Sequence, residues 1–436
     1  MSPTASAAGS PAATASPTPR AVADWPQYHR DALRTGAGPA TPVLDSPRRA
    51  WAKSLDGRVY ASPLIVGGRV IAATENDTVY AIDLRSGAVA WSRHLGTPVD
   101  ARTLPCGNIS PVTGITGTPA ADPLSGQLYV VAFVSGYHHV LFVLNLADGS
   151  VSRSVPVDPA GSVPAVQQQR SALALTPGYV YIAYGGLAGD CGPYHGYVVA
   201  VPRAGGTPLA YRTPSARESG LWTPMGVTVL DTGDVYAVTG NGSFSSSFDF
   251  SNTVLELSAD LKLKGYFAPA NWRQLDAADI DLGSVGATVL PALGVVLAIG
   301  KDGILYLLRE GALAGIGGSV AAARVCDGAF GGSAWFAGRV FLPCTNGLVA
   351  IDVTTGGMSV AWRAPGVRVA SPILAAGAVW AIDLYSATLF AVDPGSGAVL
   401  YQLGLGATPH FATPAATQGF VVAPAASSIV AVAVAP

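Results

Sequence analysis

The stretch "YAIDLRSGAVAW", residues 80–91, contains the structural unit on which the fold depends. An apolar run ends at Asp83, the pair Ser86-Gly87 favours a tight turn, and a second apolar run ends at Trp91. An Asp side chain accepts hydrogen bonds from the N–H groups of a turn, and glycine permits the positive φ that such turns use. The stretch therefore predicts a β-hairpin, and Trp91 offers a large apolar face to a neighbouring element.

The same order of apolar strand, Asp or Asn, glycine turn and apolar return recurs along the chain. Clear copies occupy residues 141–155, 347–362 and 389–401. Weaker copies occupy residues 197–211, 253–267 and 304–318, and a truncated copy ends the chain. Counting these strands gives eight units spaced by about 40 to 60 residues, which is the spacing that four-stranded propeller blades require.

Two further strands precede each of these hairpins. The stretches "ASPLIVGGRVIAATEND" (61–77) and "ATPAATQGFVVAPAAS" (412–427) show a small residue and Pro, an apolar strand, a glycine turn and a second strand. Proline is tolerated at the first residue of a strand because no ladder hydrogen bond is needed there. Near-continuous apolar strands indicate sheets that are covered on both faces. We therefore predict an all-β fold, an eight-bladed β-propeller of four-stranded antiparallel blades.

The two ends of the chain predict how the ring closes. The last unit stops after its third strand, whereas "PRRAWAKSL" (47–55) precedes the first complete unit and supplies the missing fourth strand. Pairing of this N-terminal strand with the last blade would remove two free sheet edges. We expect a single propeller domain over residues 24–436. Residues 1–23 are almost entirely Ala, Ser, Thr and Pro, and we expect a disordered linker there.

The composition limits the partners and the compartment. Only 12% of the 436 residues are charged and the formal net charge is −2, so we expect neither a nucleic acid nor an anionic membrane surface as partner. No apolar run reaches about 18 residues, so we predict no membrane span. A linker rich in Ala, Ser, Thr and Pro is typical of a tether for an exported domain. We expect an extracytoplasmic monomer, secreted or anchored at the cell surface through the linker.

Four cysteines agree with export, because disulfides form in oxidising compartments. They allow three pairings. We favour Cys326 with Cys344, because the residues between them are expected to form a strand, a turn at Ala337-Gly338 and the returning strand. That choice leaves Cys106 with Cys191, both in loops that contain Gly and Pro. The alternative is four buried free thiols.

The pattern A-x-D-x-x-[ST]-G-x-x-x-W at residues 81–91, with its repeats, resembles the eight-bladed propellers of the PQQ-binding-like superfamily. The stretch "DWPQYHRDALRTGAGP" (24–39) is similar to the N-terminal segment of that family. The superfamily contains quinoprotein alcohol dehydrogenases and non-enzymatic outer-membrane assembly lipoproteins of the BamB type. The resemblance implies either an exported oxidoreductase with PQQ and Ca²⁺ as cofactors, acting on an alcohol or sugar, or a binding or assembly scaffold. A small molecule would lie in the axial funnel, or a protein partner on the propeller face.

Candidate site residues lie in the segments that lead into the innermost strands, because these segments ring the axial funnel. Three such stretches carry polar or bulky residues that strand formation does not need: "VQQQRSALAL" (166–175), "SGLWTPMG" (219–226) and "LDAADIDLGSVGATVL" (275–290). We expect Arg170, Trp222, Asp281 and His410, which come from four different blades, to meet on one face of the ring. A cation, an aromatic plane and a carboxylate that converge in a funnel indicate a ligand site.

The resemblance to quinoprotein dehydrogenases implies a role for each of these positions. Asn241 of "TGNG" (239–242) and Asp279 are the implied Ca²⁺ ligands, and Asp281 or Asp279 is the implied general base toward the alcohol. Lys301 of "GKDGILYLL" (300–308) would lie near the quinone and Trp222 under its ring. Arg170, Gln169 and His410 complete the expected cofactor-binding residues.

Structural roles are the alternative for the same residues. The aspartates of residues 275–290 would then cap turns, and Asn241 would be a turn residue between two glycines. His138 or His139 could join His195 in a metal site, although hydrogen bonding within loops is the favoured role for these histidines. The sequence contains neither the adjacent Cys-Cys pair that commonly covers the quinone in the dehydrogenases nor a haem-attachment motif.

Overall fold

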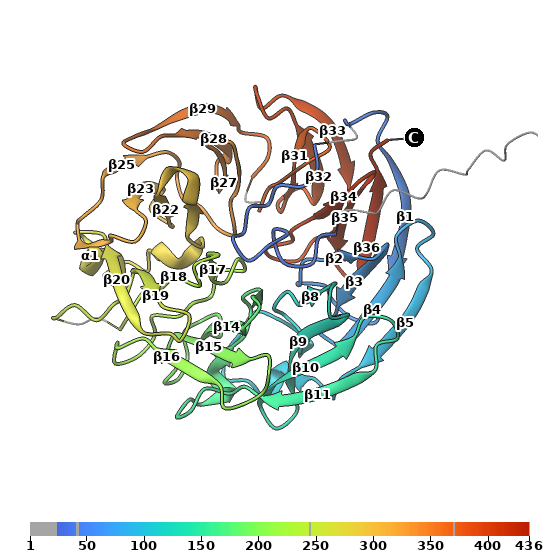
Figure 1. The fold of residues 1–436 in the computed structure, drawn as a ribbon, viewed down its shortest axis with the longest axis horizontal. Coiled ribbons are helices and arrows are strands. Elements are labelled where there is room, and N and C mark those ends of the chain that lie inside the picture. Colours follow the sequence, from blue (N-terminus) through green and yellow to red (C-terminus); the bar gives the residue numbers. More distant parts are fainter. Residues whose placement is uncertain (1–23, 41–42, 244–245, 369–370, 436) are drawn as a thin grey trace, which may run out of the picture.

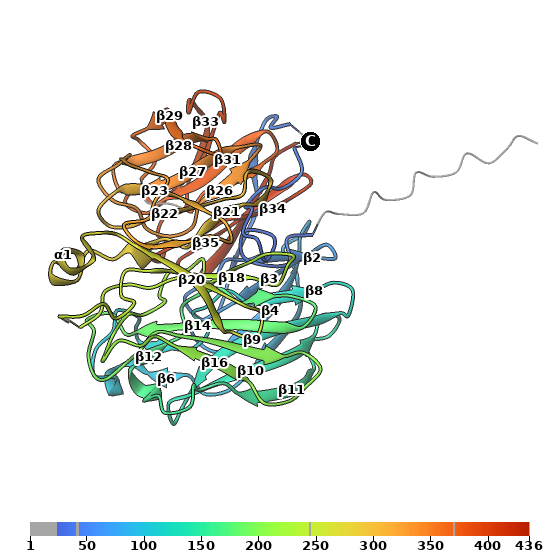
Figure 2. The same cartoon turned by 60° about the vertical axis from the view of Figure 1, so that its left-hand side comes forward.

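The computed structural model describes residues 24–40, 43–243, 246–368 and 371–435. In these residues, eight sheets of four or five strands stand around a central axis and follow one another in chain order (Figure 1). Seen obliquely, the orange and red blades fill the upper half of the ring and the green blades the lower half (Figure 2). The predicted eight-bladed, all-β propeller is therefore confirmed. The predicted linker, residues 1–23, lies outside the described residues.

The first four blades occupy the N-terminal half of the chain. Blade 1 consists of β2 (Leu64–Val66), β3 (Arg69–Ala73), β4 (Thr78–Asp83) and β5 (Val89–His94). Blade 2 consists of β8 (Ala120–Asp122), β9 (Gln127–Val134), β10 (His138–Asn145) and β11 (Val151–Pro156). Blade 3 consists of β12 (Gln167–Gln168), β13 (Ala174–Leu175), β14 (Tyr179–Gly186), β15 (Tyr197–Pro202) and β16 (Leu209–Arg212). Blade 4 consists of β17 (Thr228–Val229), β18 (Val235–Val238), β19 (Val254–Leu257), β20 (Leu263–Ala268) and the added β24 (Ala314–Ile316).

The other four blades complete the ring. Blade 5 consists of β21 (Thr288–Leu290), β22 (Val295–Ile299), β23 (Ile304–Arg309) and β25 (Ala321–Arg324). Blade 6 consists of β26 (Ala334–Phe336), β27 (Arg339–Cys344), β28 (Gly347–Val353) and β29 (Met358–Ala364). Blade 7 consists of β30 (Ile373–Ala375), β31 (Ala378–Asp383), β32 (Thr388–Val392) and β33 (Val399–Gly404). Blade 8 consists of β34 (Ala415–Thr417), β35 (Phe420–Ala425), β36 (Ser428–Ala433) and the N-terminal β1 (Arg48–Ser54).

Short elements lie between the blades. The strands β6 (Val99–Asp100) and β7 (Val112–Thr113) form a small hairpin between blades 1 and 2, and the helix α1 (Trp272–Ala277) follows blade 4. Single 3-10 turns occupy Ala101–Thr103, Pro164–Val166, Leu282–Ser284 and Pro291–Leu293. None of the helices in the described part of the chain is long and apolar enough to cross a membrane.

One predicted hairpin is wrong in its second half. We expected residues 304–318 to provide the third and fourth strands of one blade. The third strand, β23, forms as expected, but β24 pairs in parallel with β20 of the preceding blade, and β25 is the fourth strand. Gly315 and Gly317 both have φ of +73°. Positive φ at two positions interrupts the regular strand that would return along β23, so the chain reaches blade 4 before it returns.

The hairpin at residues 80–91 forms as the sequence predicts. Oδ1 of Asp83 accepts hydrogen bonds from the backbone N–H of Ser86 at 2.8 Å and from its hydroxyl at 2.7 Å. These hydrogen bonds stabilise the ionised form and lower the pKa of Asp83. Gly87 adopts a φ of +72°, and its N–H donates to the carbonyl oxygen of Asp83 at 2.9 Å. Asp83 therefore caps the turn, as its place at the end of a strand predicts.

A tryptophan of one blade packs on the turn glycine of the next blade. A Cβ atom added to Gly149 would lie 2.6 Å from Cε3 of Trp91, so the indole occupies the space of a side chain there. Nε1 of Trp91 also donates to the carbonyl oxygen of Leu146 at 3.1 Å. The same packing joins two other pairs, Trp51 with Gly87 and Trp362 with Gly397. The repeated sequence motif thus connects neighbouring blades.

The ring closes between the two ends of the chain. β1 pairs antiparallel with β36 over Arg48↔Ala433 to Ser54↔Ser428. In Figure 1 the blue β1 lies beside the red β36. Closure by the N-terminal strand is therefore confirmed, and it covers the edge that β36 would otherwise expose.

Residues 24–39 run across the middle of the ring (Figure 1) and form backbone bridges to β2 and β30. Arg34 of this segment is fully buried. Its guanidinium donates to the carbonyl oxygen of Leu173 at 3.0 Å and to that of Val227 at 3.1 Å. Leu173 leads into blade 3 and Val227 into blade 4, so Arg34 holds two neighbouring blades to the central segment. Breaking this arrangement would leave a buried charge without partners.

Two disulfides are present, with the pairings that the sequence favoured. Cys326 and Cys344 have Cα atoms 6.0 Å apart and are buried in the core of blades 5 and 6. Cys106 and Cys191 have Cα atoms 6.2 Å apart and join two loops that are 85 residues apart in the sequence. Among the described residues no cysteine is free.

Candidate functional site

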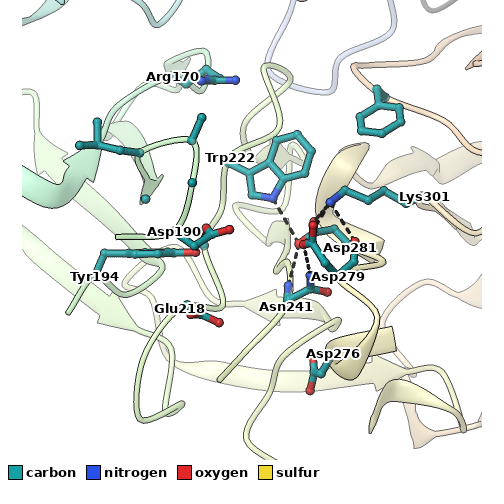
Figure 3. A pocket seen from close by; sticks show the side chains of 16 residues that line it. Arg170, Asp190, Tyr194, Glu218, Trp222, Asn241, Asp276, Asp279, Asp281 and Lys301 are labelled. Carbon is teal, nitrogen blue, oxygen red and sulfur yellow. Dashed lines mark hydrogen bonds and ion pairs between the residues drawn. The ribbon is translucent and has the colours of Figure 1, made fainter. Parts of the chain in front are cut away.

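A cavity of about 400 Å³ opens where the inner strands of blades 3 to 6 begin. Its side chains come from segments leading into inner strands and from loops between second and third strands, and Figure 3 shows them around the cavity. The lining residues are Arg170, Gly186, Leu187, Ala188, Gly189, Asp190, Tyr194, Glu218, Gly220, Trp222, Asn241, Asp276, Asp279, Asp281, Lys301 and Phe330. The volume suits a small organic molecule rather than a peptide or a nucleic acid strand.

Asp281 lies at the centre of the hydrogen-bond network in this cavity (Figure 3). Its side chain is 8% exposed, and its Oδ1 accepts from the backbone N–H of Asn241 at 2.7 Å and from Nε1 of Trp222 at 3.4 Å. Gly240 allows this approach, because a Cβ there would lie 2.2 Å from Oδ1. Burial raises the pKa of Asp281, although the charge of Lys301 opposes the rise. Asp281 is therefore a buried carboxylate held in a fixed orientation.

Lys301, in the turn between β22 and β23, is the cationic partner of Asp281. Its Nζ lies 2.5 Å from Oδ2 of Asp281 and donates to the backbone carbonyl oxygen of Asp279 at 3.0 Å. Burial disfavours the charged ammonium, but the two carboxylates outweigh this effect and raise the pKa of Lys301. The ammonium also lies 5.8 Å from the centre of the Trp222 ring. Lys301 therefore keeps its positive charge in the cavity.

Asn241 and Asp279, the implied metal ligands, bond to each other. Nδ2 of Asn241 donates to Oδ1 of Asp279 at 2.6 Å, and Oδ1 of Asn241 accepts from Nδ2 of Asn252 at 3.2 Å. The described residues contain no group of three or more His, Cys, Asp or Glu side chains that could hold a metal ion. In this arrangement Oδ1 of Asn241 and Oδ1 of Asp279 already have hydrogen-bond donors.

Asn252 is fully buried and forms hydrogen bonds with residues of the cavity wall. Its Nδ2 also donates to Oδ1 of Asp276 at 2.8 Å, and its Oδ1 accepts from the N–H of Leu282 at 2.7 Å. Oδ2 of Asp276 accepts from the hydroxyl of Ser251 at 2.7 Å. Burial raises the pKa of Asp276 to about 6. Asp276, at the end of α1, thus bonds residues of blade 4 and does not cap a turn of its own segment.

Trp222, Phe330 and the cation Arg170 line the other side of the cavity, and Phe411, which is not a lining residue, packs against Trp222. The Trp222 ring lies 6.3 Å from the Phe330 ring and 6.2 Å from the Phe411 ring, between their centres. The guanidinium of Arg170 lies 5.5 Å from the centre of Phe411, and its Nη2 donates to Oδ1 of Asn108 at 3.1 Å. Figure 3 shows Arg170 apart from the group of residues around Asp281. One cation, Lys301, thus lies over the indole of Trp222, and the other, Arg170, lies over the ring of Phe411.

Gln169 and His410 do not line this cavity. Gln169 turns into the protein, where its Nε2 donates to the carbonyl oxygen of Ser171. His410 lies in an adjoining narrow cavity with Tyr60, whose ring centre is 6.2 Å away. Burial and the nearby Arg170 lower the pKa of His410. The other predicted site residues, Arg170, Trp222, Asn241, Asp279, Asp281 and Lys301, all line the main cavity.

The histidine pair at residues 138 and 139 has the structural role that the sequence favoured. Nδ1 of the buried His139 lies 2.9 Å from Oδ1 of Asp158, and Nδ1 of His138 lies 3.2 Å from its Oδ2. The backbone of His195 instead pairs with the side chain of Gln167. The two histidines are thus bonded to one carboxylate, and His195 bonds elsewhere.

Asp190, Tyr194 and Glu218 line the cavity but were not predicted. The hydroxyl of Tyr194 donates to Oδ1 of Asp190 at 2.5 Å, and Arg217 pairs with Glu218. Asp190 and Tyr194 belong to the loop "GDCGPYH" (189–195), whose conformation no strand pattern specifies. The favoured Cys106–Cys191 pairing was the one signal in the sequence that could have placed Asp190 in the site. Asp190 precedes Cys191, and the bridge brings its loop to the loop of Cys106, which contacts Arg170 through Asn108.

Comparison with known families identifies a match over just over half of the chain. The family model described as outer membrane protein assembly factor BamB matches residues 35–260. No curated protein matches the chain.

Solved structures of similar fold include both enzymes and an assembly protein. A quinohemoprotein alcohol dehydrogenase from Pseudomonas putida HK5 has a TM-score of 0.76 at 14% identity, covering 94% of this chain and 80% of its own. A europium-containing methanol dehydrogenase has a TM-score of 0.68 at 14% identity, covering 92% and 89%. BamB from Moraxella catarrhalis has a TM-score of 0.61 at 13% identity, covering 89% and 98%. At these identities the likeness concerns the fold alone.

Proposed function

The chain belongs to the PQQ-binding-like family of eight-bladed β-propellers, and on this basis we propose that it is an extracytoplasmic oxidoreductase that binds PQQ and oxidises an alcohol or a sugar. One observation carries the proposal. The buried carboxylate of Asp281 is paired with Lys301 beside Trp222, in a cavity of about 400 Å³. The two disulfides support the extracytoplasmic location, because such bridges persist in oxidising compartments.

The residues of the cavity fit a planar, anionic quinone. PQQ is a fused aromatic ring system that carries three carboxylates. Trp222 would stack on its rings, and Arg170 and Lys301 would pair with carboxylates or a carbonyl oxygen at the two ends. When bound, PQQ supplies a two-electron acceptor to the substrate.

Asp281 is the proposed general base. Burial raises the pKa of Asp281, which makes it a stronger base than an exposed carboxylate, while the positive charge of Lys301 opposes the rise and favours the ionised form. The N–H groups of Asn241 and Trp222 bond Oδ1, so they fix the carboxylate in one orientation. In this proposal Asp281 accepts the proton of the substrate hydroxyl, and Lys301 stabilises the charge that remains in the cavity.

A Ca²⁺ ion fits the described site less well than the quinone does. Asn241 and Asp279 would be its ligands, but Oδ1 of each accepts a hydrogen bond, and no third acidic or imidazole ligand completes a set among the described residues. No step above therefore depends on a metal ion. Ca²⁺ enters the test as a separate variable.

Turnover tests the proposal. Purified protein is incubated with PQQ, with and without Ca²⁺, and assayed for dye reduction with a panel of primary alcohols and aldoses. Asp281→Asn should abolish reduction. Asp148→Asn is the matched control, because Asp148 is an exposed turn residue of blade 2 whose Oδ1 accepts from Ser150 at 2.6 Å. Equal rates in the two variants would contradict the role of Asp281.

A binding or assembly scaffold is the second candidate. It is favoured by the match to the BamB family model and by the coverage of 98% of the BamB chain. In that case a protein partner would bind the propeller face, and neither PQQ binding nor substrate-dependent dye reduction would be found.

A further inference from the structure

The Cys106–Cys191 disulfide lies directly behind one wall of the cavity. Gly189, which lines the cavity, has a φ of +102°, and a Cβ added to it would lie 3.4 Å from Cβ of Cys106. Asp190, another lining residue, is bonded in sequence to Cys191. The bridge therefore holds the backbone of this wall against the loop that carries Cys106.

The loop that carries Cys106 also holds a cation of the cavity. Oδ1 of Asn108, two residues after Cys106, accepts from Nη2 of Arg170 at 3.1 Å. Arg170 lines the cavity and stands over Phe411. The same Nη2 also donates to Oε1 of Gln168 at 3.1 Å. The bridge thus fixes the Gly189-Asp190 backbone and holds the loop that supplies one of the two hydrogen-bond acceptors of Arg170.

Little else in the described structure ties this loop to the ring. The hairpin β6–β7, at its base, pairs over only two residues on each strand. Between residues 105 and 110, the attachments among the described residues are the disulfide, the Asn108–Arg170 hydrogen bond and the buried side chain of Ile109. Without the bridge the loop would gain conformational freedom, and the wall would lose its support.

The second disulfide differs in accessibility. Cys326 and Cys344 are 4% and 0% exposed, within the core of blades 5 and 6. Cys106 and Cys191 are only half-buried. A thiolate must reach a sulfur atom to exchange with it, so a mild reductant should open the Cys106–Cys191 bridge first.

We propose that the Cys106–Cys191 disulfide is a redox-sensitive latch that holds the cavity in its ligand-binding form. The inference rests on the proposed function for the identity of the ligand, an anionic quinone. In the oxidised protein the latch keeps Arg170 and the Gly189-Asp190 wall in place. In the reduced protein the loop moves away, and the anionic ligand binds less tightly because its site is no longer preorganised.

The Cys106–Cys191 disulfide opens by thiol–disulfide exchange with a dithiol. A dithiol reductant attacks one sulfur of the bridge as a thiolate and forms a mixed disulfide, which releases the other cysteine as a thiol. The second thiol of the reductant then resolves the mixed disulfide. The protein gains two electrons and two protons, and the reductant becomes a cyclic disulfide.

The test compares oxidised protein, mildly reduced protein and the Cys106→Ser/Cys191→Ser variant. Alkylation and mass spectrometry confirm that Cys326–Cys344 remains closed in the reduced sample. PQQ affinity is measured by equilibrium dialysis, and hydrogen exchange is measured at residues 101–113 and 187–195. We expect PQQ affinity to fall on the order of tenfold after reduction, to return on reoxidation, and to be insensitive to the reductant in the double variant.

Hydrogen exchange separates failure of the latch from failure of the proposed function. If PQQ binds to no form, faster exchange at 187–195 in the reduced protein still supports a latch on a site for another ligand. Unchanged exchange would overturn the latch whatever binds, and equal PQQ affinity in the oxidised and reduced forms would overturn its control of the site. Asn108→Ala leaves the bridge intact but removes the hydrogen bond to Arg170, so it should also weaken PQQ binding. If the Cys106→Ser/Cys191→Ser variant does not fold, Asn108→Ala replaces it in the test.

Discussion

Nζ of Lys301 lies 2.5 Å from Oδ2 of Asp281, and both side chains face a cavity whose other side is aromatic. A carboxylate with so little exposure is stable only with a partner, because desolvation penalises its charge. Lys301 has a second partner in the backbone carbonyl oxygen of Asp279. The pair is therefore not a surface ion pair of small effect but a fixed acid–base group inside a ligand-sized space.

The first prediction concerns Asp281→Asn and stability. The amide oxygen can still accept from Asn241 and Trp222, but the amide NH₂ group would face the ammonium of Lys301, which keeps only its contacts with Asp279. Loss of the buried negative charge removes a desolvation cost that offsets part of this loss. We therefore expect the free energy of unfolding to fall by about 1–3 kcal/mol, with the variant still folded. Urea unfolding of the wild type and the variant measures it. A variant that does not fold would show that Asp281 is chiefly a structural residue.

The second prediction concerns the contact between Trp91 and Gly149. Gly149→Ala would place a Cβ 2.6 Å from the indole at a φ of +71°, so it should displace Trp91 and cost about 1–3 kcal/mol beyond the backbone strain. Gly126→Ala is the matched control, because Gly126 has a φ of +68° in the same blade and nothing within 4 Å of the added Cβ. If chemical denaturation shows the same loss of unfolding free energy for Gly149→Ala and Gly126→Ala, the contact with Trp91 does not contribute to stability.

The third prediction concerns pH. Glu75 and Asp77 are buried in the turn between β3 and β4, and three of their oxygens have no hydrogen-bond partner among the described residues. Burial raises the pKa of Glu75 to about 7 and that of Asp77 to about 9. In an unfolded chain both groups titrate near pH 4. The folded protein thus binds more protons, and the unfolding free energy should fall as pH rises from about 5 to 9.

Melting temperatures of Glu75→Gln and Asp77→Asn test this sign, since each variant should reduce the fall between pH 5 and 9. Asp83→Asn is the control, because hydrogen bonds from Ser86 lower the pKa of Asp83. Its stabilisation is present above the unfolded pKa and is lost only in acid, so its removal should leave the pH 5–9 slope unchanged. A wild-type melting temperature that rises through this range would contradict the prediction.

The fourth prediction concerns ring closure. A chain that begins at residue 56 lacks β1 and the central segment 24–39, so it exposes the edge of β36 and loses the hydrogen bonds of Arg34. Compared with a chain that begins at residue 24, we expect a melting temperature lower by more than about 10 °C, or an insoluble product. Similar melting temperatures for the two chains would contradict the role of the N-terminal strand.

The repeated hairpin was predictable because its information is local. Asp83, Gly87 and Trp91 each determine one feature of the unit, namely the cap, the turn and the contact with the next blade. Counting such units predicted the number of blades, and the missing strand of the last unit predicted closure by β1. The predicted hairpin at residues 304–318 was wrong because Gly315 and Gly317 redirect the backbone toward blade 4. A pattern of apolar residues does not reveal such a change of direction.

The cavity was predictable only where its residues precede inner strands. Arg170, Trp222 and Asp281 occupy such positions, and the ring geometry brings them together. Asp190 and Glu218 lie in irregular loops, whose paths depend on tertiary contacts such as the Cys106–Cys191 bridge. Gln169 precedes an inner strand as well, but its side chain satisfies the backbone of Ser171 instead of facing the cavity. Sequence position alone does not distinguish these two orientations.

The measurement that tests the central claim most directly is the equilibrium dialysis of PQQ against the oxidised protein, with Trp222→Ala as the matched variant. If the cavity binds the quinone between its aromatic and cationic residues, the wild type should retain about one PQQ per chain and Trp222→Ala should lose most of the affinity. No retention by the wild type, with or without Ca²⁺, would contradict the proposed oxidoreductase and favour the scaffold.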